Sequence, residues 1–191
     1  ILRHVDSKTF PDDPLRVLRA AQFAARFHFG IARETIEISK DMDLSFLSGE
    51  RVLEELKKAL LTSDCPSVFF QILREMEQLE VWFPEVKQLI GIEQNPVYHP
   101  EGDVWNHTML VIDEAAKLRE EVSAPFYIMI SALAHDFGKA VTTEKRNGQI
   151  HALQHEKKGL PMAEAFLRRI TGERALIQYV LNMVEMHMKP N

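Results

Sequence analysis

An apolar predicted helix leads into a cluster of polar groups at Tyr127-Ile128-Met129-Ile130-Ser131-Ala132-Leu133-Ala134-His135-Asp136-Phe137-Gly138-Lys139, and this segment is the most informative about the fold. An imidazole and a carboxylate side by side can both bind a divalent cation when a helix end turns them toward a neighbouring helix. Gly138 is expected to permit that turn, and Lys139 is expected to face a phosphate. The stretch therefore predicts a metal site at the end of a helix.

The rest of the chain is predicted to be helical as well. Apolar residues recur at intervals of three and four almost everywhere, and few windows show the alternation of a strand. The first helix has Asp13 as N-cap and Pro14 at its first position, and it should end at Gly30. Further helices are expected over residues 33–41, from Ser48, after Pro66, and over residues 104–120, 125–137, 155–170 and 173–188. The predicted fold class is all-α.

A stretch of low helicity divides the chain into two predicted helical units. Its prolines and glycines are Pro84, Gly91, Pro96, Pro100 and Gly102. We place the boundary between residues 93 and 94, which gives one unit over residues 1–93 and a second over residues 94–191.

Composition limits the kinds of protein this can be. The chain has 191 residues, 46% of them apolar, which is enough to fill a core. Its formal net charge of -5 gives no global attraction to nucleic acid, so any RNA contact must come from a local basic face. Cys65 is the single cysteine, which fits a reducing cytoplasm, and charged residues interrupt every long apolar segment, which argues against a membrane helix.

Histidines supply further candidate metal ligands around His135 and Asp136. His107 lies on the preceding predicted helix, whose apolar positions would pack on the His135 helix, so it should provide a third ligand. His155 and His187 lie on the next helices and are additional candidates that local spacing does not fix. Such a site would lower the pKa of a bound water and polarise a phosphoryl oxygen, while Lys139 neutralises the leaving phosphate. Phosphate esters are the expected substrates.

A second candidate site lies on the first predicted helix. Arg16, Arg19, Phe23 and Arg26 are three or four residues apart, so they share one face, as expected for a surface that binds a nucleotide or a phosphate backbone. Asp13 and Arg16 together offer an acceptor and a planar set of donors. That pair could recognise the exocyclic amine and ring nitrogen that cytosine and adenine share. The competing interpretation is that the aspartates cap the helix and the arginines are simply solvated.

His107 and the His135-Asp136 pair, followed by Gly138 and Lys139, resemble the HD superfamily of metal-dependent phosphohydrolases. The lead-in His99-Pro100-Glu101-Gly102-Asp103 is similar to the version fused to bacterial tRNA nucleotidyltransferases. In that superfamily an aspartate on a later helix usually provides a fourth ligand, whereas here Met188 follows His187. The resemblance implies catalytic roles for His107, His135, Asp136 and Lys139, and a site for Mg, Ni or Mn.

The segment Asp12-Asp13-Pro14-Leu15-Arg16 resembles the neck helix of bacterial tRNA nucleotidyltransferases, with Asp12 where the family usually has glutamate. This resemblance implies that Asp12, Asp13, Arg16 and Arg19 bind the incoming CTP or ATP, and that residues 1–93 form a neck and body that contact tRNA. It also implies that Arg51 and Glu55 brace the neck. Because Ile1 is not a methionine, we expect an excised fragment whose polymerase head lies upstream.

The leading hypothesis is therefore the neck, body and HD region of an enzyme that adds CCA to tRNA 3' ends, unable to polymerise by itself. One alternative is a free-standing metal phosphohydrolase acting on 2',3'-cyclic nucleotides or phosphomonoesters. Another is a degenerate HD scaffold that supports RNA binding or forms a homodimer. The sequence leaves the oligomeric state open.

Overall fold

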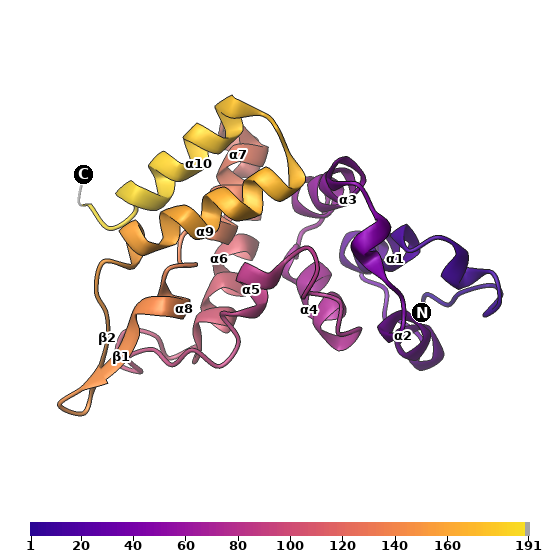
Figure 1. Cartoon of the computed structure of the whole chain (residues 1–191), viewed down its shortest axis with the longest axis horizontal. Helices are drawn as coiled ribbons and strands as arrows, with labels where there is room; N and C mark the ends of the chain where they lie inside the picture. The colour runs from indigo at the N-terminus through magenta and orange to yellow at the C-terminus, as the bar shows by residue number, and fades with distance from the viewer. Residues whose placement is uncertain (190–191) are drawn as a thin grey trace.

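The computed structural model describes residues 1–189 and is largely helical, which confirms the predicted all-α class. Figure 1 shows α1 to α4 gathered near the N-terminus, and α6, α7, α9 and α10 gathered near the C-terminus, with α5 between them. The helices are α1 (Leu15–Phe27), α2 (Arg33–Lys40), α3 (Gly49–Thr62), α4 (Ser67–Glu75), α5 (Pro84–Lys87), α6 (Val104–Leu118), α7 (Pro125–Ala134), α8 (Lys139–Thr142), α9 (His155–Ile170) and α10 (Arg174–Met186). Short 3-10 turns occupy Phe10–Asp12, Leu44–Phe46 and Arg119–Glu121.

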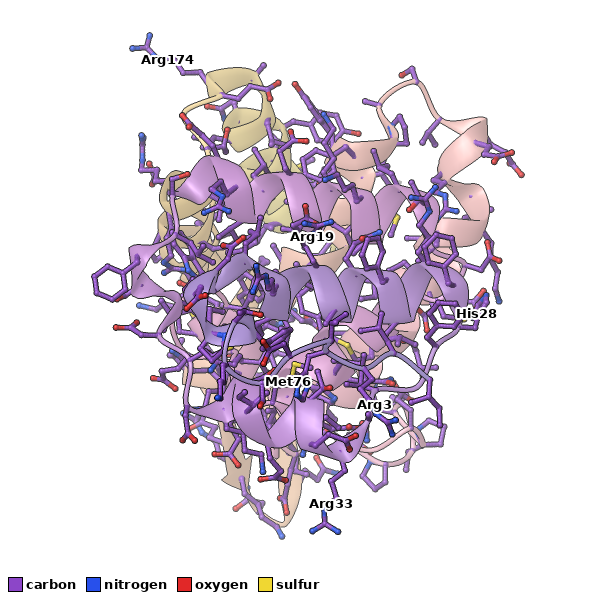
Figure 2. All side chains as sticks on the ribbon, turned by 90° about the vertical axis from the view of Figure 1, so that its right-hand side faces the viewer. Arg3, Arg19, His28, Arg33, Met76 and Arg174 are labelled. Atoms are coloured by element: carbon purple, nitrogen blue, oxygen red, sulfur yellow. The ribbon has the colours of Figure 1, made fainter. Side chains whose placement is uncertain are left out.

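Helix α1 begins close to where the sequence predicts and ends earlier. The N-cap is Pro14 and the first helical residue is Leu15, one position later than predicted, while the backbone N–H of Leu15 donates to the Asp13 carboxylate over 3.2 Å. The helix ends at Phe27 because His28 takes a left-handed conformation with φ of 54°. The prediction that it runs on to Gly30 was therefore wrong. From the N-terminal side of the molecule, Arg19 on α1 and Arg33 at the start of α2 are seen to reach into solvent (Figure 2).

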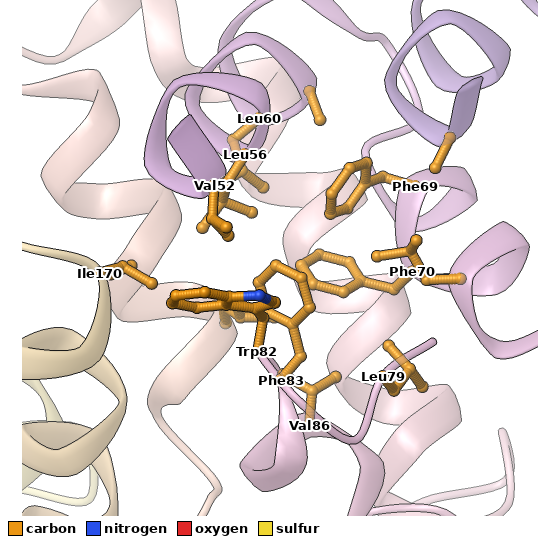
Figure 3. Close-up of a cluster of buried hydrophobic side chains, with 14 of the residues drawn as sticks. Val52, Leu56, Leu60, Phe69, Phe70, Leu79, Trp82, Phe83, Val86 and Ile170 are labelled. Carbon is orange, nitrogen blue, oxygen red and sulfur yellow. The ribbon is translucent and has the colours of Figure 1, made fainter. Parts of the chain in front are cut away.

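Aromatic side chains fill the centre of the molecule. Phe69, Phe70 and Phe83 meet edge to face, with ring centroids 5.2 to 5.9 Å apart, an arrangement that aromatic quadrupoles favour. Trp82 lies beside them, and Ile170 at the end of α9 approaches the same cluster (Figure 3). The buried apolar residues on both sides of position 93 belong to one continuous core. The two predicted units thus share a core, and the division at residue 93 stays a prediction.

Two polar contacts also connect the two halves. Arg169 on α9 donates to both carboxylate oxygens of Glu85 on α5, at 2.8 and 2.6 Å. The carboxylate of Asp113 on α6 accepts from the backbone N–H of Ser67 at 2.9 Å and from its hydroxyl at 2.7 Å, which caps the start of α4. Each contact fixes a helix of one half against the other.

The sequence analysis did not predict the β-hairpin of β1 (Thr143–Arg146) and β2 (Gln149–Ala152), nor the short helices α5 and α8. Asn147 and Gly148 turn the chain with positive φ values of 51° and 79°, the signature of a tight hairpin turn. The strands have only four residues each and mostly polar side chains, so they carry little alternation that a sequence pattern could reveal.

Candidate metal centre

Asp136 lies at the centre of the candidate site and is only 2% exposed. The preceding helix α7 ends at Ala134, two residues before Asp136. The predicted end of that helix was residue 137, three residues later. The next residue, Phe137, is fully buried and packs edge to face against Phe166 of α9, with ring centroids 5.8 Å apart. This anchor in the core holds the backbone of Asp136 in place.

The predicted pair of His107 and His135 faces one oxygen of this carboxylate. The Nε2 atom of His135 lies 3.1 Å from Asp136 Oδ2, and Nε2 of His107 lies 3.6 Å from the same oxygen. The two Nε2 atoms are 3.4 Å apart. Helix α6, which carries His107, packs directly on α7, as the sequence analysis expected.

The other two candidates, His155 and His187, face the second oxygen. His155 begins α9, and its Nε2 lies 3.2 Å from Asp136 Oδ1. His187 directly follows α10, and its Nε2 lies 3.7 Å from the same oxygen. Their Nε2 atoms are 3.1 Å apart. The structure therefore brings all five predicted metal ligands together, with Asp136 between two pairs of imidazoles.

Hydrogen bonds fix the tautomer of these imidazoles. The Nδ1 atoms of His135, His155 and His187 lie 2.8, 2.7 and 2.6 Å from the carbonyl oxygens of Ala132, Ala152 and Val184, three residues back in each case. Because a carbonyl can only accept, each Nδ1 carries the proton. A neutral ring then leaves its Nε2 lone pair facing Asp136, which is the form that binds metals.

This donor set fits a divalent cation. Unprotonated nitrogens that face one another next to a buried carboxylate repel unless a positive charge lies between them. Two atoms bound to one ion at about 2.1 Å are separated by roughly 3 to 3.4 Å, which is the spacing within each histidine pair. Asp136 Oδ2 is buried and lacks a hydrogen bond of good geometry, although the Lys139 ammonium is 2.8 Å away. We call His107, His135 and Asp136 Oδ2 the first half-site, and His155, His187 and Asp136 Oδ1 the second half-site.

Lys139 contacts Asp136 in addition to lining the cavity, and its contact with a phosphate stays a prediction. Its ammonium lies 2.8 Å from Asp136 Oδ2 and donates to Gln94 Oε1 at 2.8 Å, so it is held within the first half-site as well as lining the cavity. Gly138 has ordinary helical dihedrals, with φ of -63°. Gly138 permits the turn as expected, but its dihedral angles are ones that any residue can adopt. A side chain there would instead overlap the backbone of His155 and Gly159.

Electrostatics keep the centre anionic. Burial alone would raise the pKa of Asp136, but the imidazoles of His135, His155 and His187 hold it well below its usual range. Burial lowers the pKa of His107, more than its contacts with Glu101 and Asp136 raise it. Burial lowers the pKa of His155, but its contacts with the Asp136 carboxylate and the Ala152 carbonyl raise it overall, so metal binding in the second half-site has to displace a proton from this ring.

The centre lies at the bottom of a cavity of about 540 Å³. The hairpin forms part of its wall through Gln149 and His151, and Tyr98 and Met188 line it as well. His99 lies in a loop and is partly buried here, and its Nδ1 lies 3.0 Å from Glu101 Oε1. The sequence analysis assigned no role to Glu101.

The second candidate site is a cavity of about 370 Å³ beside α1. Arg16, Arg19 and Phe23 line it together with His4 and Phe10, so the basic face of the helix does border a pocket. Arg16 donates to the backbone carbonyls of Thr9 and Phe10, at 3.3 Å for the latter, which fixes the guanidinium at the cavity edge.

The predicted aspartates lie apart from this cavity. Asp13 accepts from Arg51 on α3 at 3.1 Å, and Asp12 is exposed in the preceding 3-10 turn. Neither Asp12 nor Asp13 is among the described residues that line the cavity. Arg51 thus contacts the start of α1 as expected for a brace, whereas the buried carboxylate of Glu55 pairs with Lys58 on its own helix.

Comparison with known proteins agrees with both halves of this description. Residues 28–90 match a family described as the probable RNA and SrmB- binding site of polymerase A, and residues 104–191 match the HD domain. The multifunctional CCA protein of Actinobacillus pleuropneumoniae is 39% identical over 98% of this chain, and that of Shewanella denitrificans is 42% identical over 88%. The chain is a homologue of the multifunctional CCA proteins.

These relatives are longer than this chain. The matched region covers 46% of the A. pleuropneumoniae protein and 41% of the S. denitrificans protein, so the chain spans about half the length of the CCA proteins that it matches. The HD match covers all the metal-ligand candidates, and the RNA-binding match begins at residue 28, just after α1. Among the described helices, none combines the length and apolar character needed to cross a bilayer.

Proposed function

We propose that the HD domain of this chain is a metal-dependent phosphohydrolase in which two divalent cations share Asp136, one in each half-site. The observation that carries this proposal is the position of the Asp136 carboxylate, with one oxygen toward His107 and His135 and the other toward His155 and His187. Mg, Mn or Ni are the candidate metals, since imidazole and carboxylate accept each of them.

The chain's own residues would prepare the site for a phosphate ester. Bound divalent cations supply Lewis acidity toward a phosphoryl oxygen and acidify water. The carbonyls behind His135, His155 and His187 hold the rings with Nε2 toward the cavity floor. Lys139 lines the same cavity and can neutralise charge on a departing phosphate once its ammonium leaves Asp136. The cavity volume suits a 2',3'-cyclic nucleotide or a phosphomonoester.

The test is metal content and hydrolysis of the same purified protein. The chain should bind close to two equivalents of Mn²⁺ or Ni²⁺ and hydrolyse 2',3'-cyclic AMP, and Asp136→Ala should lose both properties. His151→Ala changes an imidazole of the cavity wall outside the half-sites and should keep the metal content. Equal metal binding by wild type and Asp136→Ala would contradict the proposal. Metal binding without hydrolysis would instead favour the scaffold alternative.

We infer a second function for the N-terminal part, namely selection of CTP or ATP and contact with tRNA as a portion of a CCA-adding enzyme. The cavity lined by Arg16, Arg19 and Phe23 supports this inference, because guanidinium groups and an aromatic ring suit a phosphorylated nucleotide. The names of the relatives and the RNA-binding family match point the same way. Asp12 and Asp13 remain predicted nucleotide-binding residues of the intact enzyme.

Binding of fluorescent CTP and ATP tests this second function. Arg16→Ala and Arg19→Ala should each weaken binding roughly tenfold, the value of about 1.4 kcal/mol for a charge-assisted contact. Arg174→Ala removes an exposed arginine at the start of α10 and is the matched control. Affinity that does not respond to either change on α1 would show that this cavity does not hold the nucleotide.

A further inference from the structure

We propose that Glu101 is a positioning residue that fixes the tautomer of His107 and raises the affinity of the first half-site for its cation. This inference rests on the proposed metal-dependent function. It starts from a contact outside the half-sites. Oε1 of Glu101 lies 2.7 Å from Nδ1 of His107, on the side of the ring opposite to Asp136.

Glu101 differs in kind from the groups that orient the other imidazoles. His135, His155 and His187 each donate Nδ1–H to a neutral backbone carbonyl of their own helix or turn. His107 instead meets a carboxylate from a separate loop. The same Glu101 oxygen lies 2.7 Å from Nδ1 of His107 and 3.0 Å from Nδ1 of His99. A charged carboxylate can only accept, so the proton must lie on Nδ1 of His107, and Nε2 presents its lone pair to the half-site.

The loop is built so that Glu101 cannot easily move away. Gly102 has a φ of 108°, a conformation that side chains rarely adopt, and it directly precedes the N-cap of α6. That cap, Asp103, accepts from the backbone N–H of Asn106 at 2.8 Å and from that of Gly91 at 2.7 Å. The side chain of Asn106 donates to the backbone carbonyl of Glu101 at 3.2 Å. The backbone of Glu101 is therefore tied to the first turn of the helix that carries His107.

His99 provides a second donor to the same oxygen. Its Nδ1 lies 3.0 Å from Glu101 Oε1, and its ring meets the His107 ring edge to face at 4.8 Å between centroids. The carboxylate is only 18% exposed, so solvent competes weakly for it. A negative charge held against Nδ1–H increases the basicity of the opposite ring nitrogen, and such partners of metal-binding histidines typically change metal affinity about 10- to 100-fold.

The experiment measures Mn²⁺ or Ni²⁺ binding by titration calorimetry to the full chain. Glu101→Gln should weaken the first half-site about 10-fold or more, because the amide keeps the shape and loses the charge, and Glu101→Ala should weaken it further. The second half-site should keep its wild-type affinity in both variants. Glu93→Gln removes the same charge from an exposed residue that lines the same cavity, and we expect it to change neither affinity by more than about threefold.

A measurement without metal separates this inference from the proposed function. Nitrogen-15 NMR of the chelator-treated protein should show His107 protonated at Nδ1, and Glu101→Ala should remove that preference while the tautomers of His135, His155 and His187 persist. The two experiments together separate the possible failures. If the wild type binds no metal in the calorimetric titration, the proposed function fails, whatever the NMR shows. If it binds two cations and Glu101→Gln binds them equally tightly, the positioning role is overturned and the metal centre stands. A variant that fails to melt cooperatively is replaced by Glu101→Asp, which retains the charge at a shorter reach and should fall between wild type and Glu101→Ala.

Discussion

The backbone of Gly138 lies directly against the backbone of His155, closer than any side chain at position 138 would permit. Gly159, one turn further along α9, touches Gly138 as well, since a Cβ on Gly159 would lie 3.0 Å from the Gly138 nitrogen. Two glycines thus let the start of α9 approach Asp136 until His155 Nε2 is 3.2 Å from its carboxylate. The second half-site exists because of this close packing.

Gly138→Ala should therefore damage the second half-site selectively. The methyl group forces α9 away from Asp136, at a cost of about 1 to 3 kcal/mol for overpacking, and separates His155 and His187 from their shared oxygen. We expect metal content to fall from two equivalents to one, as measured on the purified variant. His107 and His135 lie on α6 and beside α7, so the first half-site should still fill.

Gly172→Ala is the matched control, because a Cβ at Gly172 has open space around it. That variant should keep both metals and its unfolding free energy within about 0.5 kcal/mol of wild type. Two metals in Gly138→Ala would mean that α9 tolerates the displacement and that the close approach is not what builds the site.

The role of Gly138 also shows what the sequence could and could not predict. The stretch that ends in His135 and Asp136 identified the metal centre, because ligand types and helical context are local properties. The reason for Gly138 lies in the contact with α9, and no local pattern carries that information. Glu101 was visible in the sequence six residues before His107, but only the left-handed backbone of Gly102 brings it back onto the ring.

Most helices were predicted, and the predicted bounds of α9 agree with the structure, whereas the end of α1, the end of α7 and the hairpin were not predicted. His28 stops α1 by adopting a left-handed conformation with φ of 54°, which residues other than glycine adopt only occasionally, although histidine does so more often than most. The hairpin over Thr143–Arg146 and Gln149–Ala152 has too few apolar residues to show a period of two. Asp13 accepts from the backbone N–H of Leu15 without being the N-cap, and Arg16 and Arg19 border a cavity.

The contact between Arg169 and Glu85 should be a main connection between the two halves of the molecule. Glu85 is 6% exposed and receives both nitrogens of the guanidinium, so Arg169→Ala leaves a buried carboxylate without its partner. We expect a loss of roughly 2 to 4 kcal/mol in the free energy of unfolding, below the value for a fully buried pair because a quarter of Arg169 is exposed. Urea unfolding followed by circular dichroism measures this.

The neighbouring pair of Arg168 and Glu164 provides the comparison on the same helix. Arg168 is 66% exposed, so its ion pair is screened by solvent, and Arg168→Ala should cost less than about 0.5 kcal/mol. Similar losses for the two arginine variants would contradict the connecting role. A double-mutant cycle with Glu85→Gln then isolates the pairwise coupling from other effects of truncating Arg169.

Lys139 should oppose metal binding and assist hydrolysis, which makes its removal a test with two opposite outcomes. Its ammonium lies 2.8 Å from Asp136 Oδ2, so a cation entering the first half-site must displace a like charge that is only 11% exposed. Lys139→Met keeps much of the side-chain volume and removes the charge. We expect Mn²⁺ affinity at the first half-site to rise about tenfold. This change corresponds to about 1.4 kcal/mol, roughly a third of the Coulomb repulsion between two charges about 4 Å apart at an effective dielectric of 20. Turnover of 2',3'-cyclic AMP should fall about 100-fold under metal saturation, because no other lysine or arginine is among the described residues that line the cavity. Lys157→Met removes the same charge from an exposed position on α9 and should change neither quantity by more than about threefold. Weaker metal binding in Lys139→Met would show that the ammonium supports the half-site rather than competes for it.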